Sequence, residues 1–238
     1  MNKAIKIIAI LMLITGLGLF FYPITLRYYF NHTAEKNIND FIDLRKEIQP
    51  ESNTSDNVLP YSELRKAMIS YNQQLWENKQ SGLIDQLSYE KPDFNLSDYG
   101  IDSEILGYIS IPSIDVELPV YNGASKENMA KGAAYLAHTS LPVGGNNTNC
   151  VIAAHTRWKG VHIFKKITEL RAGDKIYFTN LWETLVYQVV ETKIIDPTDS
   201  QNIYIQEGRQ LLTLSTCHPY PDNYQRYLVF AELTDSYA

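Results

Sequence analysis

The sequence predicts a mainly β domain, a barrel or a sandwich, that follows an N-terminal apolar helix and a helical segment. Beyond about residue 100, roughly seven or eight short apolar and β-branched runs are separated by turn residues, with only brief helical pieces between them. The chain has 238 residues, of which 45% are hydrophobic, so it is long and apolar enough to bury a core.

An uncharged apolar run, "IIAILMLITGLGLFFYPI", covers residues 7–24 and follows Lys3 and Lys6. Its length is close to the ~20 residues that a helix needs to cross a bilayer. The positive end of such a helix stays inside, so we expect residues 1–6 to be a cytoplasmic tip and the rest to lie outside the cell. A cleaved signal peptide is the competing interpretation. No small-x-small cleavage site follows the run, which favours a retained, single-pass transmembrane signal anchor.

Residues 25–100 are expected to form a helical stalk and linker. "AEKNINDFIDLRKEI" has helical apolar spacing and ends before Pro50, where the polar loop "PESNTSDNV" begins. A second helix is predicted from Pro60 to about Ser81-Gly82. We interpret its apolar stripe as packing against the following domain; the stripe consists of Leu64, Met68, Tyr71 and Leu75.

The β domain is expected to span residues 101–238. Internal prolines in the first predicted strand region, 106–121, suggest edges or bends. The other predicted strands are "CVIAAHT" (150–156), two strands around "NLWET" within 175–195, "LLTLSTC" (211–217) and "RYLVFAEL" (226–233). The net charge of −6 argues against a nucleic-acid partner. No phosphate loop or paired metal motif is present in the sequence, so we expect neither a cofactor nor a metal.

Three chemically active side chains stand at strand ends. His155 ends one predicted strand, Cys217 ends another, and Arg226 begins a third. Together a thiolate can attack a carbonyl, an imidazolium can protonate the leaving amine, and a guanidinium can stabilise the oxyanion. Each of these residues alone is more often structural. His138 and His162 are the other histidines considered as the base, and His155 is preferred.

A disulfide is the alternative role for Cys217, because the only other cysteine is Cys150 and the domain is expected outside the cytoplasm. Cys150 opens the strand that His155 closes, and five residues of strand span roughly 16 Å. If Cys217 lies beside His155, Cys150 is too distant to bridge. We therefore interpret Cys150 as a small core residue.

The sequence motifs around these residues resemble those of the sortase transpeptidases. "TLSTC" matches the family's TLxTC word, and "TSLPVGGNNTNCVIAAHTRW" is similar to the segment around the sortase histidine. "ELPVYNGAS", "HIFKKITELRAGDKIYF" and "TLSTCHPY" resemble the pilin-polymerising sortases, class C, more than the housekeeping ones. The likeness covers about residues 101–233.

The resemblance implies an eight-stranded sortase β-barrel and a cysteine transpeptidase that cleaves an LPxTG-like sorting signal between Thr and Gly. It assigns the nucleophile to Cys217, the histidine to His155 and the arginine to Arg226, and the family's Thr before the nucleophile falls on Thr216. Ser215 is expected to be a further supporting residue. A thioester would then pass to an amine: a pilin lysine in pilus assembly, or a peptidoglycan precursor in anchoring enzymes. The expected setting is a Gram-positive cell membrane, with the catalytic domain on the extracellular face.

Three departures bear on the subclass. Residues 89–100 hold Pro92-Asp93-Phe94, the residue types of a class C lid word in another order, so this stretch is a degenerate lid or a linker. Class C enzymes often carry a second transmembrane helix, and only the N-terminal apolar run is found here. His218 occupies the position where the family usually has Thr. Two roles are open for it: it adjusts the reactivity of the Cys217 thiolate, or it is a solvated turn residue.

Three functions remain open from the sequence. The leading hypothesis is a membrane-anchored pilus sortase acting on pilins with sorting signals. A housekeeping sortase or a plain hydrolase is the enzymatic alternative. The third is an inactive barrel that binds sorting signals without turnover.

Overall fold

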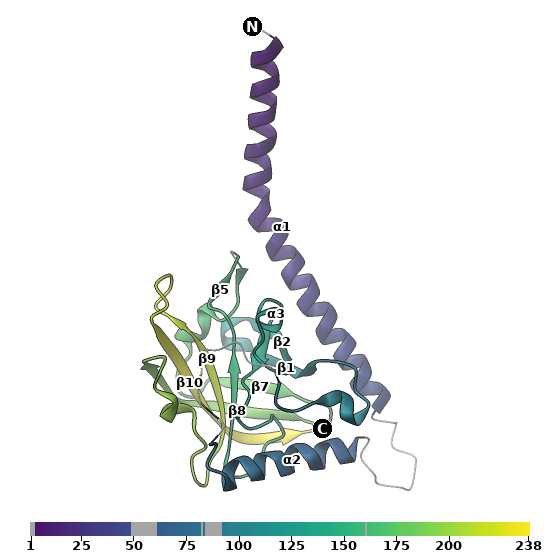
Figure 1. Cartoon of the computed structure of the whole chain (residues 1–238), viewed down its shortest axis with the longest axis vertical. Helices are drawn as coiled ribbons and strands as arrows, with labels where there is room; N and C mark the ends of the chain where they lie inside the picture. Colours follow the sequence, from purple (N-terminus) through teal and green to yellow (C-terminus); the bar gives the residue numbers. More distant parts are fainter. Residues whose placement is uncertain (1–2, 49–60, 82, 84–91, 160) are drawn as a thin grey trace.

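The computed structural model describes residues 3–48, 61–81, 83, 92–159 and 161–238. Figure 1 shows a β-barrel from which the long helix α1 (Lys3–Ile48) rises, while helix α2 (Ser62–Glu77) crosses the opposite end. The predicted polar loop after Pro50 and the first residues of the lid-like stretch, 89–91, lie outside the described residues.

Eight strands close the barrel in the order β1-β2-β3-β4-β9-β10-β8-β7, so the predicted eight-stranded barrel is confirmed and a sandwich is excluded. The pairs β2–β3 and β4–β9 are parallel, and the other pairs are antiparallel. The barrel strands are β1 (Ile105–Ile111), β2 (Val116–Tyr121), β3 (Ala133–Tyr135), β4 (Thr148–Ala153), β7 (Lys175–Thr179), β8 (Thr184–Ile195), β9 (Gln210–His218) and β10 (Gln225–Tyr237).

The remaining elements are short. A separate two-stranded hairpin, β5 (Arg157–Trp158) and β6 (Val161–His162), follows β4. The helical pieces are α3 (Lys126–Met129) and the 3₁₀ turns η1 (Leu96–Tyr99), η2 (Pro112–Ile114), η3 (Lys165–Glu169) and η4 (Ser200–Ile203).

The predicted strand region 106–121 consists of two strands, β1 and β2, with a bend at one of its prolines, as the sequence suggested. Pro112 opens the turn η2, and Asp115 then takes a left-handed conformation with φ 54°, which reverses the chain into β2. Proline has no N–H to give to a ladder, so the bend at this position follows from the residue itself. The three-residue strand β3 had no signal of its own in the sequence, because it is too short to show an alternation.

Barrel closure depends on a close approach between β1 and β7. Gly107 of β1 faces Thr179 at this contact, and a Cβ at Gly107 would stand 2.2 Å from the Thr179 carbonyl oxygen. Ile109, Ile152 and Phe178, from three different strands, are completely buried in the core behind it. The absence of a side chain at Gly107 therefore lets the first barrel strand reach β7.

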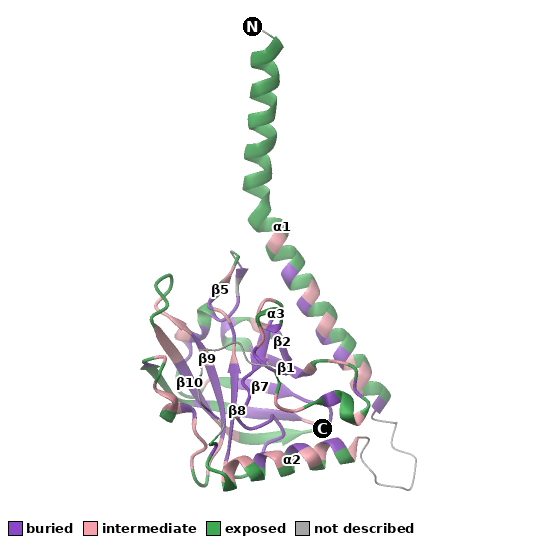
Figure 2. Ribbon diagram, viewed as in Figure 1, coloured by how far each residue is buried: buried purple, intermediate pink, exposed green. Residues whose placement is uncertain are grey.

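The predicted anchor and the first part of the stalk are one continuous helix, α1. Residues 7–24 are exposed along their whole length, and Figure 2 shows burial beginning only in the second half of the helix. There Phe30, Ala34, Ile38 and Phe41 form a buried stripe at helical spacing. This half lies against β1, β2 and β6.

Helix α2 is attached to the barrel by both apolar and polar contacts. Leu64 and Met68 of the predicted stripe are buried, as expected, and Tyr71 is partly buried. Asn72 is buried as well: its amide donates to the Leu141 carbonyl at 3.0 Å and accepts from the Leu141 N–H at 2.7 Å. The helix ends at Glu77, earlier than predicted, and Lys79 and Gln80 follow with positive φ.

We predict that Asn72→Ala lowers the free energy of unfolding by about 2 kcal/mol, because it leaves the buried Leu141 N–H without its partner and removes one of the two hydrogen bonds to the Leu141 carbonyl, the other coming from the Val143 N–H. Urea denaturation of the full chain in detergent measures this change. The matched control is Gln73→Ala, an exposed neighbour whose loss should change stability by less than about 0.5 kcal/mol. Equal midpoints for the two variants would contradict the role given to Asn72.

Candidate active site

Strand pairing brings the three predicted residues to one end of the barrel. Cys217 of β9 pairs directly with Arg226 of β10. Side chains of directly opposed residues share a face, with Cβ atoms about 4.5–5.5 Å apart. Parallel pairing of β4 with β9 ends at Ala153 opposite Ser215, and the Ala154 N–H still donates to the Ser215 carbonyl at 3.2 Å. Two residues beyond Ala153, His155 therefore lies alongside Cys217.

Two threonines fasten the end of β4 to the end of β9. The Thr156 hydroxyl donates to the Cys217 carbonyl at 2.5 Å, and the Thr216 hydroxyl donates to the Ala154 carbonyl at 2.8 Å. The two hydroxyl oxygens are 2.9 Å apart. Both side chains are buried, whereas Cys217 is partly exposed. Because side chains alternate between the two faces of β9, Thr216 points inward, where its hydrogen bond holds the two strand ends together, and the Cys217 thiol stays accessible.

The imidazole of His155 stacks on the indole of Trp158, with ring centroids 4.7 Å apart and planes 9° from parallel. Burial lowers the pKa of His155, because desolvation disfavours the imidazolium. The Phe164 N–H donates to the His155 carbonyl at 3.0 Å, which fixes the backbone. Trp158 and Thr156 were not singled out from the sequence; their only signal was their position in "HTRW", directly after the histidine.

The guanidinium of Arg226 is oriented by its own turn. Its Nη1 donates to the Gln225 carbonyl at 2.8 Å and to the Asn223 carbonyl at 3.2 Å. Arginine remains charged at any physiological pH, so a fixed positive charge stands across the strand pair from Cys217. That charge is suited to stabilising a thiolate or an oxyanion.

The other two predicted positions, Ser215 and His218, lie close to Cys217 on β9. Ser215 is two residues before Cys217 on β9, on the same face of the strand, and pairs with Leu228. His218 pairs with Gln225, and its ring lies 5.6 Å from the ring of Tyr227 at 48°. The roles expected for these two residues stay predictions.

His138 belongs to a different polar cluster. Its Nδ1 lies 3.3 Å from a carboxylate oxygen of Asp93, and its backbone N–H donates to the same oxygen at 2.7 Å. The Tyr71 hydroxyl also donates to Asp93, and burial, together with this carboxylate, raises the pKa of Tyr71 well above its usual value. Through Asp93 the lid-like stretch is attached to α2 and to the loop after β3.

Phe94, the next residue of the lid-like stretch, stacks on Tyr99 at 5.7 Å, and its carbonyl accepts from the Asn122 amide at 2.7 Å. These contacts give the described part of the stretch a defined place on the barrel. That it plugs the active site stays a prediction.

Both cysteines are free, and Cys150 is buried at the level of Leu212 on β9, five residues before Cys217. Burial raises the pKa of its thiol far above the usual range, so this thiol stays protonated. Cys150 therefore takes the place of a small core residue, as the sequence predicts, and no disulfide joins it to Cys217.

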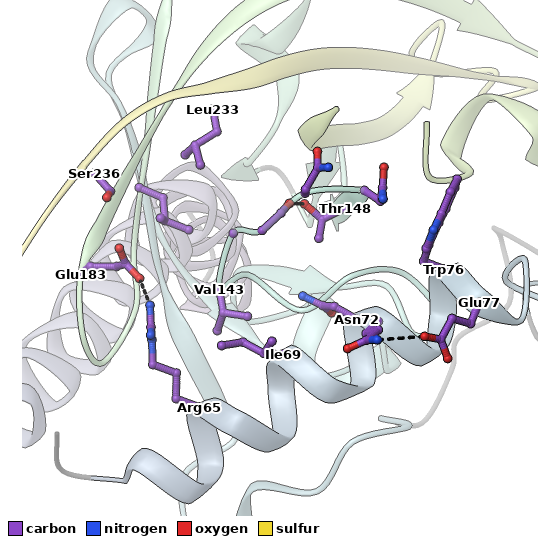
Figure 3. A pocket seen from close by; sticks show the side chains of 16 residues that line it. Arg65, Ile69, Asn72, Trp76, Glu77, Val143, Thr148, Glu183, Leu233 and Ser236 are labelled. Carbon is purple, nitrogen blue, oxygen red and sulfur yellow. Dashed lines mark hydrogen bonds and ion pairs between the residues drawn. The ribbon is translucent and has the colours of Figure 1, made fainter. Parts of the chain in front are cut away.

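A cavity of about 730 Å³ lies away from these residues, between α2, the turn at residues 143–148 and the ends of β8 and β10 (Figure 3). Leu233 and Ser236 of β10 line it, seven and ten residues along the strand from Arg226, which is ~23–33 Å. The cavity is thus not part of the candidate active site.

Comparison with known proteins identifies the fold and the chemistry together. The sortase domain family matches residues 109–234, which is more than half of the chain. Among curated proteins, sortase A of Bacillus anthracis is 29% identical over 165 residues, covering 68% of this chain and 77% of that protein.

Solved structures give the same result at higher coverage. Sortase C from Clostridium perfringens SM101 is 33% identical, with a TM-score of 0.67, and covers 84% of this chain and 99% of that chain. A structure of Clostridium perfringens sortase C with the C-terminal cell wall sorting motif is 32% identical, with a TM-score of 0.66 and coverage of 85% and 100%. Sortase C1 of Streptococcus agalactiae is 28% identical, with a TM-score of 0.71 and coverage of 84% and 97%. The chain therefore belongs to the sortase family of cysteine transpeptidases.

Proposed function

We propose that this sortase is a membrane-anchored, pilin-polymerising enzyme that cleaves an LPxTG-like sorting signal between Thr and Gly and transfers the acyl group to a pilin lysine. The observation that carries the proposal is the strand register that sets Cys217 opposite Arg226 and beside the end of β4, where His155 stands. The similarity to sortase C structures supports the pilin subclass, and the neighbour solved with a sorting motif supports that class of substrate.

In the first half of the reaction, the Cys217 thiolate attacks the threonine carbonyl carbon of the sorting signal, and a C–S bond forms. Negative charge moves to the carbonyl oxygen, where the guanidinium of Arg226 stabilises it. The imidazolium of His155 then gives its proton to the glycine nitrogen as the C–N bond breaks. The products are a thioester on Cys217 and a peptide that begins with glycine.

In the second half, an amine attacks the thioester carbonyl. The neutral imidazole of His155 accepts the proton that the amine loses, Cys217 leaves as a thiolate, and the starting charge state is restored. The Trp158 stack fixes the plane of the imidazole through both steps, and the Thr156 bond to the Cys217 carbonyl fixes the nucleophile's backbone.

Helix α1 is proposed to remain as the membrane anchor. Its apolar window has a mean hydropathy of 2.4 and no buried residue, which a signal sequence would also show. The continuity of the apolar half with the half that packs on the barrel supports retention, because cleavage between them would divide one helix.

A second candidate function is the attachment of surface proteins to peptidoglycan. The identity to sortase A of Bacillus anthracis favours it. The two functions share the thioester and differ only in the amine that accepts it.

We predict that the full chain in detergent, mixed with a pilin fragment that carries an LPxTG-like signal, forms a thioester on Cys217 that intact mass spectrometry detects. Cys217→Ala should abolish the adduct, since no sulfur remains to be acylated. His155→Ala and Arg226→Ala should each slow acylation by about 10²–10³-fold.

His138→Ala is the matched control for the histidine, because His138 lies in the Asp93 cluster rather than beside Cys217. This variant should form the adduct at the rate of the unaltered chain. Wild-type acylation rates in either the His155 or the Arg226 variant would remove that residue from the mechanism. An adduct that survives in Cys217→Ala would exclude Cys217 as the nucleophile, whereas the absence of an adduct in the unaltered chain would favour the inactive barrel.

We predict that the acyl-enzyme reacts faster with a folded pilin than with a glycine-type amine or with water. Purified acyl-enzyme is offered each acceptor in turn, and the product is identified by mass. A covalent pilin–pilin product linked through lysine supports pilus assembly. A product only with the glycine-type amine supports peptidoglycan anchoring, and release of free acid alone indicates a hydrolase.

We predict that the pKa of His155 lies below the usual histidine value near 6.5 and rises toward it in Trp158→Ala, because removing the stacked indole lets water reach the imidazolium. NMR titration of the imidazole nitrogens measures this pKa. Trp76→Ala on α2 is the matched control and should leave the value unchanged. A lower pKa for His155 in Trp158→Ala would contradict desolvation as the cause.

A further inference from the structure

The barrel end that carries Cys217 points in the same direction as the apolar half of α1. In Figure 1 the β5 hairpin and the turn between β9 and β10 both project on the side from which α1 leaves the barrel, while α2 lies at the other end. Helix α1 packs against β6, so the β5–β6 hairpin stands beside it. The orientation of the barrel relative to a membrane that holds α1 is therefore set by packing, not by a loose linker.

The distance along α1 between the apolar run and the barrel is short. The run ends at Ile24, Leu26 is already partly buried, and Phe30 is buried. At ~1.5 Å per residue these positions lie ~3–9 Å beyond the run. The headgroup layer on each side of a bilayer is about 5–8 Å thick. The barrel thus begins at the depth of the lipid headgroups.

The two projecting segments, Arg157–Lys159 and His218–Arg226, form one surface, called here the tip surface. The Arg157 guanidinium lies over the Tyr220 ring, 5.8 Å from its centroid, and joins the two segments. Tyr220 and Tyr224 are exposed to 48% and 62%, although both are large rings. On α1, just after the apolar run, Tyr28 and Tyr29 are exposed to 72% and 69%.

The charge of the tip surface also differs from that of the whole chain. It contains three basic residues and one acidic residue, while the chain carries a net charge of −6; the residues are Arg157, Lys159, Arg226 and Asp222. Tyrosine and tryptophan are enriched at membrane–water interfaces. The basic side chains of arginine and lysine are attracted to anionic lipid.

We propose that the tip surface rests on the headgroup layer of a phospholipid bilayer, so that the active site opens along the membrane surface rather than away from it. The proposal rests on the proposed retention of α1 as an anchor. It follows that Cys217 is placed to meet an acyl donor whose cleavage point stands close to the bilayer, and that the α2 end of the barrel faces the cell wall.

The test uses the full chain with Cys217→Ala, so that a single new cysteine can carry a fluorophore; Cys150 is buried and free and should not react. Three labelled variants are compared: Leu13→Cys within the apolar run, Tyr224→Cys in the tip surface, and Ser70→Cys on the exposed face of α2. Each is placed in vesicles of phosphatidylcholine and phosphatidylglycerol. Quenching by nitroxide-labelled lipids, carried on the headgroup or in the acyl chain, is then measured.

The expected result is quenching of the Tyr224 label by headgroup nitroxide, several-fold stronger than quenching of the Ser70 label, with the Leu13 label quenched by acyl-chain nitroxide. Equal, weak quenching of the Tyr224 and Ser70 labels, with Leu13 still quenched, would overturn the proposed orientation and leave the anchor intact. An unquenched Leu13 label would overturn the anchor and with it the orientation. Neither result bears on the thioester chemistry, which the adduct experiment tests separately.

Discussion

The parallel pairing of β4 with β9 is the constraint on which the active site depends. It joins the segment that ends at His155 to the segment that ends at Cys217, through a register that runs from Thr148 opposite Gln210 to Ala153 opposite Ser215. A slip of one residue would turn every side chain of β9 to the opposite face and bury the thiol. The hydrogen bonds of Thr156 and Thr216 across the strand ends oppose such a slip, because each joins a buried hydroxyl to the partner strand's backbone.

The local environment of each group follows from this register. His155 is partly desolvated and covered by Trp158, which favours a neutral imidazole that takes up a proton only when a negative charge forms nearby. Arg226 supplies a positive charge whose position is set by the carbonyls of its own turn. Among the described residues, the indole of Trp158 stacks on the imidazole of His155, and the Phe164 N–H holds the His155 carbonyl at 3.0 Å.

Helix α1 links the chemistry to its location. One half is apolar and exposed over its whole surface, and the other half carries a buried stripe against the barrel. Because the helix continues through Pro23 into the half that packs on the barrel, a membrane that holds the first half would limit the directions that the barrel can take. At the far end, Asn72 of α2 and the Asp93 cluster attach the pre-barrel segments to the domain through buried polar contacts, which are specific in geometry where apolar packing alone is not.

The sequence by itself determined the apolar run, the helical stripes and most barrel strands, because these are local patterns in which side-chain type and spacing report burial directly. It also predicted a catalytic role for His155, Cys217 and Arg226, because each is a reactive side chain at the end of an apolar strand and the segments around them resemble the sortases; that role stays a prediction. The contacts of Thr156 and Trp158, the strand β3 and the unbroken course of α1 were decided only by the tertiary structure. The Thr156 bond joins residues 61 positions apart, and nothing in either local sequence specifies its partner. Packing of the whole barrel determines which distant strands pair, so the pairing partners can be identified only in the folded chain.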